Sequence, residues 1–226
     1  MPTAWATDSK KSFDTRYIHT HMQPIETIVF DLGGVLIDWN PAYLYRKIFD
    51  DEAAIYDFLA RICTGTWNEQ QDAGRPLEEA TRILVEQFPE HSTQIQAYYG
   101  RWTEMLGGPI PGTVQLLESL HAQQSHRLYA LTNWSAETFP HALERYDFLQ
   151  RFAGILVSGE EKLIKPDPRI YALLLQRFAI QPETALFIDD NPANVAGAQA
   201  AGMQAIRFQS PEQLRTEMAA LGILNL

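Results

Sequence analysis

Isolated polar side chains follow several of the most apolar runs in this sequence, and together they could carry out chemistry on an anionic group. Taken singly, each has an ordinary explanation, because aspartate caps helices, threonine and asparagine fill turns, and a lone lysine is usually a solvated charge. Taken together, they offer carboxylates, hydrogen-bonding side chains and a cation. They are Asp31 in IVFD, Thr132 and Asn133 in YALTN, Lys165 in IKPD, and Asp189 with Asp190 in LFIDD.

The acidic residues Asp31, Asp189 and Asp190 would need a cation if the fold brought them together. Neighbouring carboxylates repel one another and raise each other's pKa values unless a positive charge lies among them. An oxygen-rich, sulfur-free site suits Mg²⁺, which takes one or two carboxylates together with phosphate oxygens and water. Thr132 and Lys165 would then donate to the remaining phosphate oxygens. Asp31 is left as the nucleophile, because a carboxylate can attack phosphorus and form an aspartyl phosphate.

The segments that must position these residues alternate between short β-rich runs and helical patterns. The alternation predicts an α/β, Rossmann-like three-layer core with a parallel sheet built from right-handed βαβ units. Ligands of such sheets bind outside the carboxyl ends of the strands, which is where the polar residues stand. The predicted strands are Thr27–Asp31, Arg127–Leu131, Phe152–Val157, Ala185–Asp189 and Gln204–Phe208, and the predicted helices are Gly112–Gln123, Ala136–Tyr146, Pro168–Ala179 and Pro192–Ala201.

The chain between the first two predicted strands is far longer than one crossover helix needs. Four segments within it place apolar residues at three-to-four spacing, so a small helical cap is expected there. They are AYLYRKIF, DEAAIYDFLARI, PLEEATRILVEQF and TQIQAYYGRWTEML. The glycine and proline cluster GGPIPG, Gly107–Gly112, is typical of a hinge. The expected organisation is a flexible tail at 1–24, an α/β core at 25–40 and 108–226, and the cap at 41–107. The aromatic residues of the cap are expected to be mainly core, with one or two facing the site: Trp67, Tyr98, Tyr99 and Trp102.

Composition limits the partners. The net charge of −10 and the pI near 5.0 argue against nucleic acid or an anionic membrane as partner, because the long-range field would repel both. The single cysteine, Cys63, excludes an intramolecular disulfide. No run approaches the ~20 apolar residues of a membrane span, and no signal peptide is recognisable, so a cytoplasmic location is expected. His19 and His21 in the tail could bind a metal, but histidines in such a segment are more often bystanders. A monomer and a homodimer both stay open.

The polar positions resemble, in order, the four motifs of the haloacid dehalogenase superfamily of hydrolases. They are Asp31 in FDLGGVLID, Thr132-Asn133, Lys165 in KPDPRIY, and Asp189-Asp190 in IDDNPANV. The resemblance covers the chain from residue 25 onward and places the predicted cap where one subgroup of the family inserts a helical bundle. Within the family, the chain is most similar to the bacterial branch that contains α-glucose-1-phosphate phosphatase, which also has FDLG in the first motif.

The resemblance implies a Mg²⁺-dependent phosphatase that hydrolyses a small phosphorylated metabolite, such as a sugar phosphate, through an aspartyl-phosphate intermediate. Asp31 would be the nucleophile, and Lys165 would neutralise both the nucleophile and the phosphate. Thr132 and Asn133 would hold the phosphoryl oxygens. The implied metal ligands are the Asp31 carboxylate, the Gly33 backbone carbonyl and Asp190, with Asp189 acting through water or through Lys165.

One position departs from the family's pattern. Most of its phosphatases carry a second aspartate two residues after the nucleophile, where this chain has Gly33. That aspartate protonates the leaving group and later activates water, and such a general acid contributes ~10²–10⁴-fold. Either the substrate has a good leaving group or another residue substitutes. Asp38 is expected to order the loop into the cap rather than to replace the acid, and Asn194 is expected to steady the metal loop by hydrogen bonding.

Two other functions stay open. The first is a 2-haloacid dehalogenase, in which Asp31 displaces halide without a metal. Dehalogenases of the family typically carry Ser and Asn where this chain has Asp189 and Asp190, and an aromatic residue where it has Leu32, so both differences favour the phosphatase. The second is a non-catalytic binding protein of the same fold, which Gly33 keeps open. The retained charges speak against it, because unused buried charges are costly.

Overall fold

A computed structural model describes residues 23–224, and its core is a five-stranded parallel sheet. The strand order β5-β4-β1-β6-β7 places β1 in the centre, between β4 and β6. The predicted α/β fold is confirmed, and each strand agrees with its predicted limits to within two residues. His19, His21 and nearly all of the predicted tail lie outside the described residues. The strands are β1 Thr27–Phe30, β4 Arg127–Thr132, β5 Gly154–Val157, β6 Ala185–Asp189 and β7 Gln204–Arg207.

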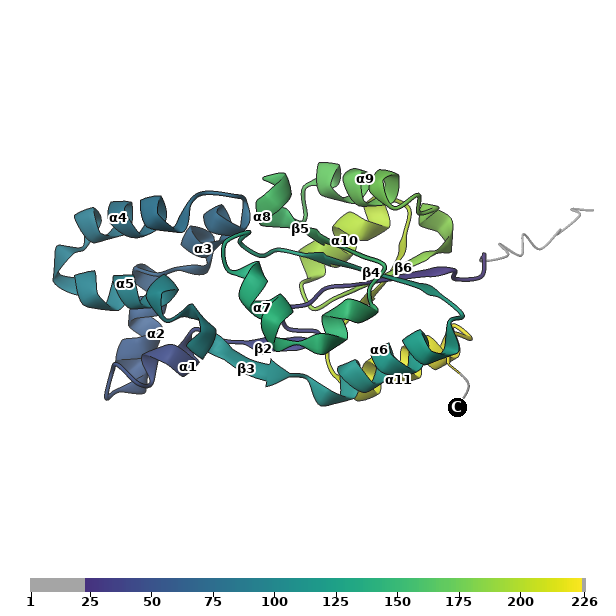
Figure 1. The fold of residues 1–226 in the computed structure, drawn as a ribbon, viewed down its shortest axis with the longest axis horizontal. Helices are drawn as coiled ribbons and strands as arrows, with labels where there is room; N and C mark the ends of the chain where they lie inside the picture. Colours follow the sequence, from purple (N-terminus) through teal and green to yellow (C-terminus); the bar gives the residue numbers. More distant parts are fainter. Residues whose placement is uncertain (1–22, 225–226) are drawn as a thin grey trace, which may run out of the picture.

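Helices cover both faces of the sheet, because the central strand has apolar side chains on both of its faces. Ile28 and Phe30 of β1 point into one core cluster, whereas Val29 points into the other. All four residues of β1 are buried, as a central parallel strand requires. Helices α6 and α11 cover the first face and α9 and α10 the second (Figure 1). These helices are α6 Pro111–Gln123, α9 Pro168–Arg177, α10 Pro192–Ala200 and α11 Pro211–Ala220.

Local signals explain where several helices begin. Asp167 accepts a hydrogen bond from the Arg169 backbone N–H and caps α9, in which Pro168 occupies the first position. The predicted helix at Ala136–Tyr146 begins three residues later, at Phe139, because its proline, Pro140, occupies the first turn where its missing N–H costs nothing. This helix is α7 Phe139–Arg145, and the short helix that follows β5 is α8 Ser158–Glu161.

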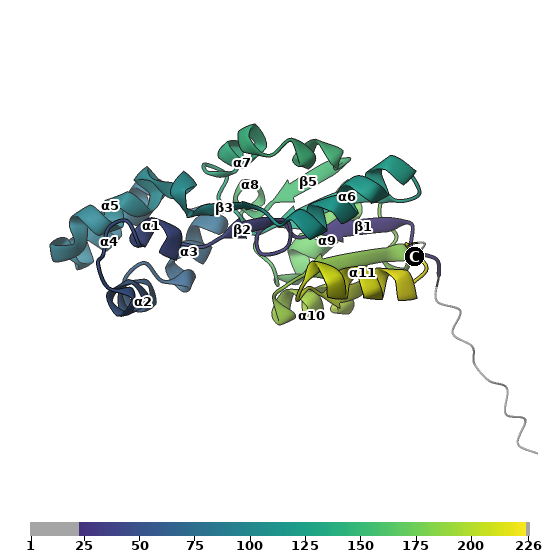
Figure 2. The same cartoon turned by 90° about the horizontal axis from the view of Figure 1, so that it is seen from below.

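A helical insert, defined here as residues 42–105, lies at one end of the molecule in both views (Figures 1 and 2). Its helix Gly65–Asp72 was not predicted, because the segment GTWNEQQD has a weak apolar pattern; the Thr64 hydroxyl caps it by accepting from the Trp67 backbone N–H. The other helices correspond to the predicted segments. They are α1 Ala42–Tyr45, α2 Glu52–Arg61, α3 Gly65–Asp72, α4 Leu77–Gln87 and α5 Ser92–Gly100, with 3₁₀ turns η1 Pro89–His91 and η2 Trp102–Met105.

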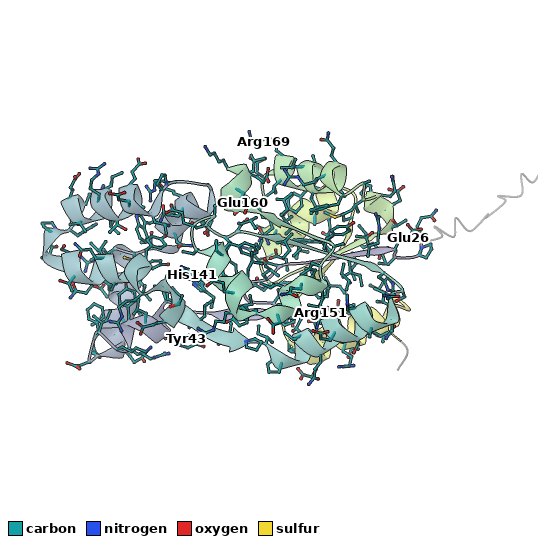
Figure 3. The ribbon with its side chains drawn as sticks, in the orientation of Figure 1. Glu26, Tyr43, His141, Arg151, Glu160 and Arg169 are labelled. Carbon is teal, nitrogen blue, oxygen red and sulfur yellow. The ribbon has the colours of Figure 1, made fainter. Side chains whose placement is uncertain are left out.

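An antiparallel two-stranded ribbon joins the insert to the core. Strand β2, Ile37–Trp39, pairs with β3, Leu106–Pro109, so the predicted hinge Gly107–Gly112 is partly a paired strand. Asp38 accepts a hydrogen bond of 2.7 Å from the Tyr43 hydroxyl, and Figure 3 shows Tyr43 at the foot of the insert beside this ribbon. The expectation that Asp38 orders the entry to the insert is therefore confirmed. No helix within residues 23–224 is both long enough and apolar enough to cross a membrane.

Candidate active site

The predicted site residues converge at the carboxyl edge of the sheet. Asp31 directly follows the central strand β1, Thr132 is the last residue of β4, and Asp189 is the last residue of β6. The Asp31 backbone N–H donates to the Ile188 carbonyl at 2.8 Å, which fixes Asp31 against the neighbouring strand. Because β4 and β6 flank β1 in register, their ends open onto one place, as the sequence predicted.

Lys165 is the buried cation of the site. Its side chain is fully buried, and its ammonium lies 2.9 Å from Asp31 Oδ1 and 2.6 Å from Asp189 Oδ2. It also donates to the Leu131 carbonyl at 2.9 Å, so each of its three N–H groups has an acceptor. Burial lowers the pKa of Lys165, but the two carboxylates outweigh burial and hold that pKa above its usual value. The lysine therefore stays charged and ties the two strand ends together.

The three carboxylates carry more negative charge than Lys165 can neutralise. Asp31, Asp189 and Asp190 each offer an oxygen, and these oxygens all lie within 4.8 Å of one another. Burial raises the pKa of Asp31 to about 7, with the Asp189 charge adding to the rise and Lys165 opposing it. Burial, followed by the Asp189 charge, also raises the pKa of Asp190. A divalent cation among these oxygens would relieve the repulsion, and hard oxygen donors suit Mg²⁺.

Asp189 and Asp190 occupy different surroundings. Both Asp189 oxygens accept from the Asn194 side chain at 3.1 Å, and one also accepts from the Asn191 backbone N–H at 2.9 Å. The predicted hydrogen-bonding role of Asn194 is confirmed. Asp190 is exposed, which leaves its carboxylate open to a metal. Gly34 leaves room for the Asp190 carboxylate, because a Cβ at this position would lie only 2.8 Å from Asp190 Oδ2. Its φ of +74° also suits glycine.

Thr132 and Asn133 differ in how much hydrogen-bonding capacity they leave for a ligand. The Thr132 hydroxyl is buried and has no hydrogen-bond partner within the described residues, as expected of a group that awaits a phosphate oxygen. Asn133 instead holds the backbone of Lys165: its Nδ2 donates to the Lys165 carbonyl at 3.0 Å, and its Oδ1 accepts from the Lys165 N–H at 2.8 Å. One amide N–H of Asn133 stays available, so its phosphate contact remains a prediction.

A small cavity of ≈ 80 Å³ lies between this edge of the sheet and the helical insert. Of the four cap aromatic residues, one or two of which were expected to face the site, Tyr99 and Trp102 line the cavity, whereas Trp67 and Tyr98 belong to the buried core of the insert. Trp102 also stacks on His141 of α7, with ring centroids 6.5 Å apart, and Figure 3 places His141 where the insert meets the core. The complete lining is Gly33, Trp39, Asn68, Asp72, Tyr99, Trp102, Asn133, Trp134, Ser135 and Thr138.

Comparisons with known proteins agree with this geometry. A family model described as a haloacid dehalogenase-like hydrolase matches residues 25–202. The sesquiterpene phosphatase astK of Aspergillus oryzae is 30% identical over 77% of this chain and 85% of its own length. The phosphorylated carbohydrates phosphatase of Thermotoga maritima is 28% identical over 80% and 84%. A haloacid dehalogenase family enzyme of Bacteroides thetaiotaomicron, solved with magnesium and inorganic phosphate, is 22% identical, has a TM-score of 0.62, and covers 82% of this chain and 95% of its own.

Proposed function

The chain belongs to the haloacid dehalogenase-like hydrolase family, and we propose that it is a Mg²⁺-dependent phosphatase that hydrolyses a small phosphomonoester through an aspartyl phosphate on Asp31. One observation carries the proposal: three carboxylate oxygens lie within 4.8 Å of one another at the ligand-binding edge of the sheet, beside a buried lysine. Such a cluster is costly unless a metal ion neutralises part of its charge, and the bound metal would then attract an anionic substrate. The phosphatases among the named relatives support the same reaction class.

The surroundings of Asp31 suit a nucleophile. One of its oxygens, Oδ1, accepts from the Leu32 N–H at 2.8 Å and from Lys165 at 2.9 Å, so the carboxylate cannot rotate freely. Its other oxygen has no hydrogen bond from the described residues and is left for phosphorus. Attack by this oxygen forms the Asp31–phosphorus bond as the bond to the ester oxygen breaks. Thr132 donates its free hydroxyl to a phosphoryl oxygen, and Lys165 opposes the rise in the Asp31 pKa and so favours the charged form of the nucleophile.

The donor set fits Mg²⁺, because every candidate ligand is an oxygen. Asp31, Asp190 and the Gly33 carbonyl would hold the ion, while Asp189 is occupied by Lys165, Asn191 and Asn194. When bound, Mg²⁺ would neutralise phosphate charge and lower the carboxylate pKa values. The pair Asp189 and Asp190 also argues against a metal-independent dehalogenase. Without a metal, their surplus negative charge would repel the carboxylate of a haloacid.

The helical insert, within the expected cap at 41–107, is proposed to act as a cap that opens to admit substrate. The cavity between the insert and the sheet edge is small, ≈ 80 Å³, so the substrate would enter while the insert is displaced from its described position, and the insert would then close over it. Aromatic side chains on its wall, among them Tyr99 and Trp102, would contact the organic part of the substrate. The preferred ester, the cytoplasmic location and the monomeric or homodimeric state stay predictions.

The decisive test measures phosphate release from a panel of phosphomonoesters, including sugar phosphates and p-nitrophenyl phosphate, with Mg²⁺ and with EDTA. Release that EDTA abolishes and added Mg²⁺ restores is the expected result. Absence of release from every ester would overturn the proposal. Chloride release from 2-chloropropionate in the presence of EDTA would assign the chain to the dehalogenases instead.

A further inference from the structure

The position that carries the general acid in most phosphatases of this family is a glycine here, Gly33, and so has no side chain. Gly33 lines the cavity, and a Cβ built on it would meet no atom within 4 Å, so nothing fills the space that an acid would occupy. The wall of this same cavity has two titratable side chains, Asp72 and Tyr99, both from the helical insert. Tyr99 is unsuited to give up a proton near neutral pH, because burial raises its pKa far above the usual value.

Asp72 is held in place from both sides of the cavity. It is the last residue of α3, and its Oδ2 accepts a hydrogen bond of 3.0 Å from Asn68 Nδ2. The Asn68 oxygen in turn accepts from the Tyr99 hydroxyl at 3.0 Å, which fixes the orientation of the amide. On the core side, the buried Ser158 hydroxyl donates to the Asp72 backbone carbonyl at 2.6 Å. The carboxyl group therefore has a defined position relative to the core.

The groups that face Asp72 favour its protonated form. Burial is the main cause of a pKa raised to about 7, and the charge of Glu69 on the same helix adds to it, while the Ser135 backbone N–H opposes the rise. Tyr98 and Tyr99 of α5 are the other titratable neighbours, and both stay neutral because burial raises their pKa values. No lysine or arginine forms an ion pair with Asp72 within residues 23–224. Near neutral pH, Asp72 can therefore both donate and accept a proton.

We propose that Asp72 is the general acid and base of this enzyme, supplied by the insert in place of the aspartate that Gly33 lacks. The inference rests on the proposed phosphatase function. In the first step Asp31 attacks phosphorus, the bond from phosphorus to the ester oxygen breaks, and that oxygen takes the Asp72 proton and leaves as the alcohol. In the second step the Asp72 carboxylate removes a proton from water as the water oxygen attacks phosphorus. The bond to Asp31 breaks, and inorganic phosphate and protonated Asp72 result.

Other acids are less suited to this role. Asp38, which lies in the β2–β3 ribbon, accepts a hydrogen bond from the Tyr43 hydroxyl of α1 and does not line the cavity. Asp189 is fully engaged by Lys165 and Asn194. Because Asp72 comes from the insert, proton transfer would be possible only when the insert lies against the core. This dependence would couple closure of the cap to the chemical step.

The test compares Asp72→Asn with wild type on two substrates that differ in their need for a proton. The alkyl ester that wild type hydrolyses fastest needs protonation of its leaving oxygen, whereas p-nitrophenolate leaves without a proton. We expect the first turnover on the alkyl ester to fall ~10²–10⁴-fold and that on p-nitrophenyl phosphate to fall less than ~10-fold. The second substrate should then give a burst of p-nitrophenol followed by slow steady release, because the base that activates water is missing.

A rescue variant separates catalysis from structure. Gly33 has room for a side chain and lacks a positive φ, so Gly33→Asp can place an acid in the family's usual position. Gly33→Asp combined with Asp72→Asn should recover at least ~10-fold of the lost alkyl-ester rate. The matched control is Asp57→Asn, which removes an exposed carboxylate of the insert and should leave both rates unchanged.

Each outcome has a distinct meaning. Equal losses on the two substrates in the first turnover, or no loss on the alkyl ester, would overturn the role of Asp72 while leaving the phosphatase intact. A wild-type protein that releases phosphate from neither substrate would instead overturn the proposed function itself.

Discussion

Asp31 belongs to the core and Asp72 to the helical insert, and burial raises the pKa of each to about 7. Their partners differ. Asp31 lies 2.9 Å from the Lys165 ammonium, whereas Asp72 accepts from the neutral Asn68 amide. A buried carboxylate beside a cation can keep its charge and attack, while one that has only neutral donors tends to keep its proton and can give it away. In the proposed mechanism, the core therefore supplies the nucleophile and the insert supplies the acid, from the same type of side chain.

The two regions also differ in how their polar groups are supported. In the core, the Lys165 ammonium has an acceptor for each N–H group, and one of these acceptors is the carbonyl of Leu131 in β4. In the insert, Asp72 depends on a chain of neutral hydrogen bonds through Asn68 to Tyr99. The core arrangement is fixed by strand ends, whereas the insert arrangement would move with its helices if the insert opens as proposed. The following variants test whether this difference governs activity and stability.

The largest expected effect is that of Asp31→Asn on turnover. An amide cannot form the phosphoenzyme, so kcat should fall on the order of 10⁴–10⁶-fold on every substrate, irrespective of the leaving group. This pattern contrasts with the substrate-dependent loss expected for Asp72→Asn. Single-turnover kinetics on p-nitrophenyl phosphate would show no burst. A variant that kept the wild-type rate would show that Asp31 is not the nucleophile, and the proposed contrast between Asp31 and Asp72 would fail.

Lys165→Met should produce the largest loss of stability. The change leaves Asp31 and Asp189 buried without their shared cation, and breaking a buried ion pair in this way costs about 3–5 kcal/mol. Urea unfolding in EDTA would measure the free energy of unfolding. The matched control is Lys47→Met, which breaks an exposed pair with Glu104 and should cost less than about 1 kcal/mol. Similar small losses in the two variants would contradict the view that Lys165 holds the core site together.

Binding of Mg²⁺ should stabilise the folded protein through the core carboxylates alone. At a Mg²⁺ concentration of 100 times its Kd, linkage predicts about 2.7 kcal/mol of added stability in wild type. Asp190→Asn should abolish most of this gain, because the exposed Asp190 carboxylate is an expected ligand. Asp72→Asn should retain it, which separates the two carboxyl groups by function. Thermal unfolding with and without Mg²⁺ checks both variants, and a loss of the Mg²⁺ effect in Asp72→Asn would place the metal elsewhere.

The core half of the comparison could be predicted from sequence, because its positions follow local rules. Asp31 and Asp189 directly follow β-rich apolar runs, and the ends of adjacent parallel strands meet by topology. Lys165 was predicted by motif order rather than by periodicity. Its hydrogen bonds with Asn133, which lies 32 residues away in sequence, could not be inferred from either segment alone.

The insert half could not be predicted, because it depends on contacts between segments far apart in sequence. Helix α3 has few apolar side chains, and the Asp72 carbonyl is fixed by Ser158, which lies 86 residues further along the chain. Nothing near Asp72 in the sequence indicates that it shares a cavity with Gly33. The missing acid at Gly33 was visible from sequence, but its replacement required the packing of the insert on the core.

The smallest expected effect is a pH-dependent gain of stability in Asp72→Asn. The folded-state pKa of Asp72, about 7, lies above its ordinary value of 3.8. The folded protein therefore holds a proton that the unfolded chain releases, and wild-type stability falls as pH rises through this window.

For a fully buried carboxyl group, the loss of unfolding free energy across this window would be at most about 4 kcal/mol. Partial exposure of Asp72 at the cavity reduces the expected loss to about 1–2 kcal/mol. Asparagine has no such penalty, so urea unfolding should show the variant gaining on wild type as pH rises from about 4 to about 7, with little further change above that. For the exposed control Asp57→Asn, the difference in unfolding free energy from wild type should not change with pH. If the difference for Asp72→Asn were also independent of pH, Asp72 would ionise as readily as a surface carboxylate and would not be a proton donor near neutral pH.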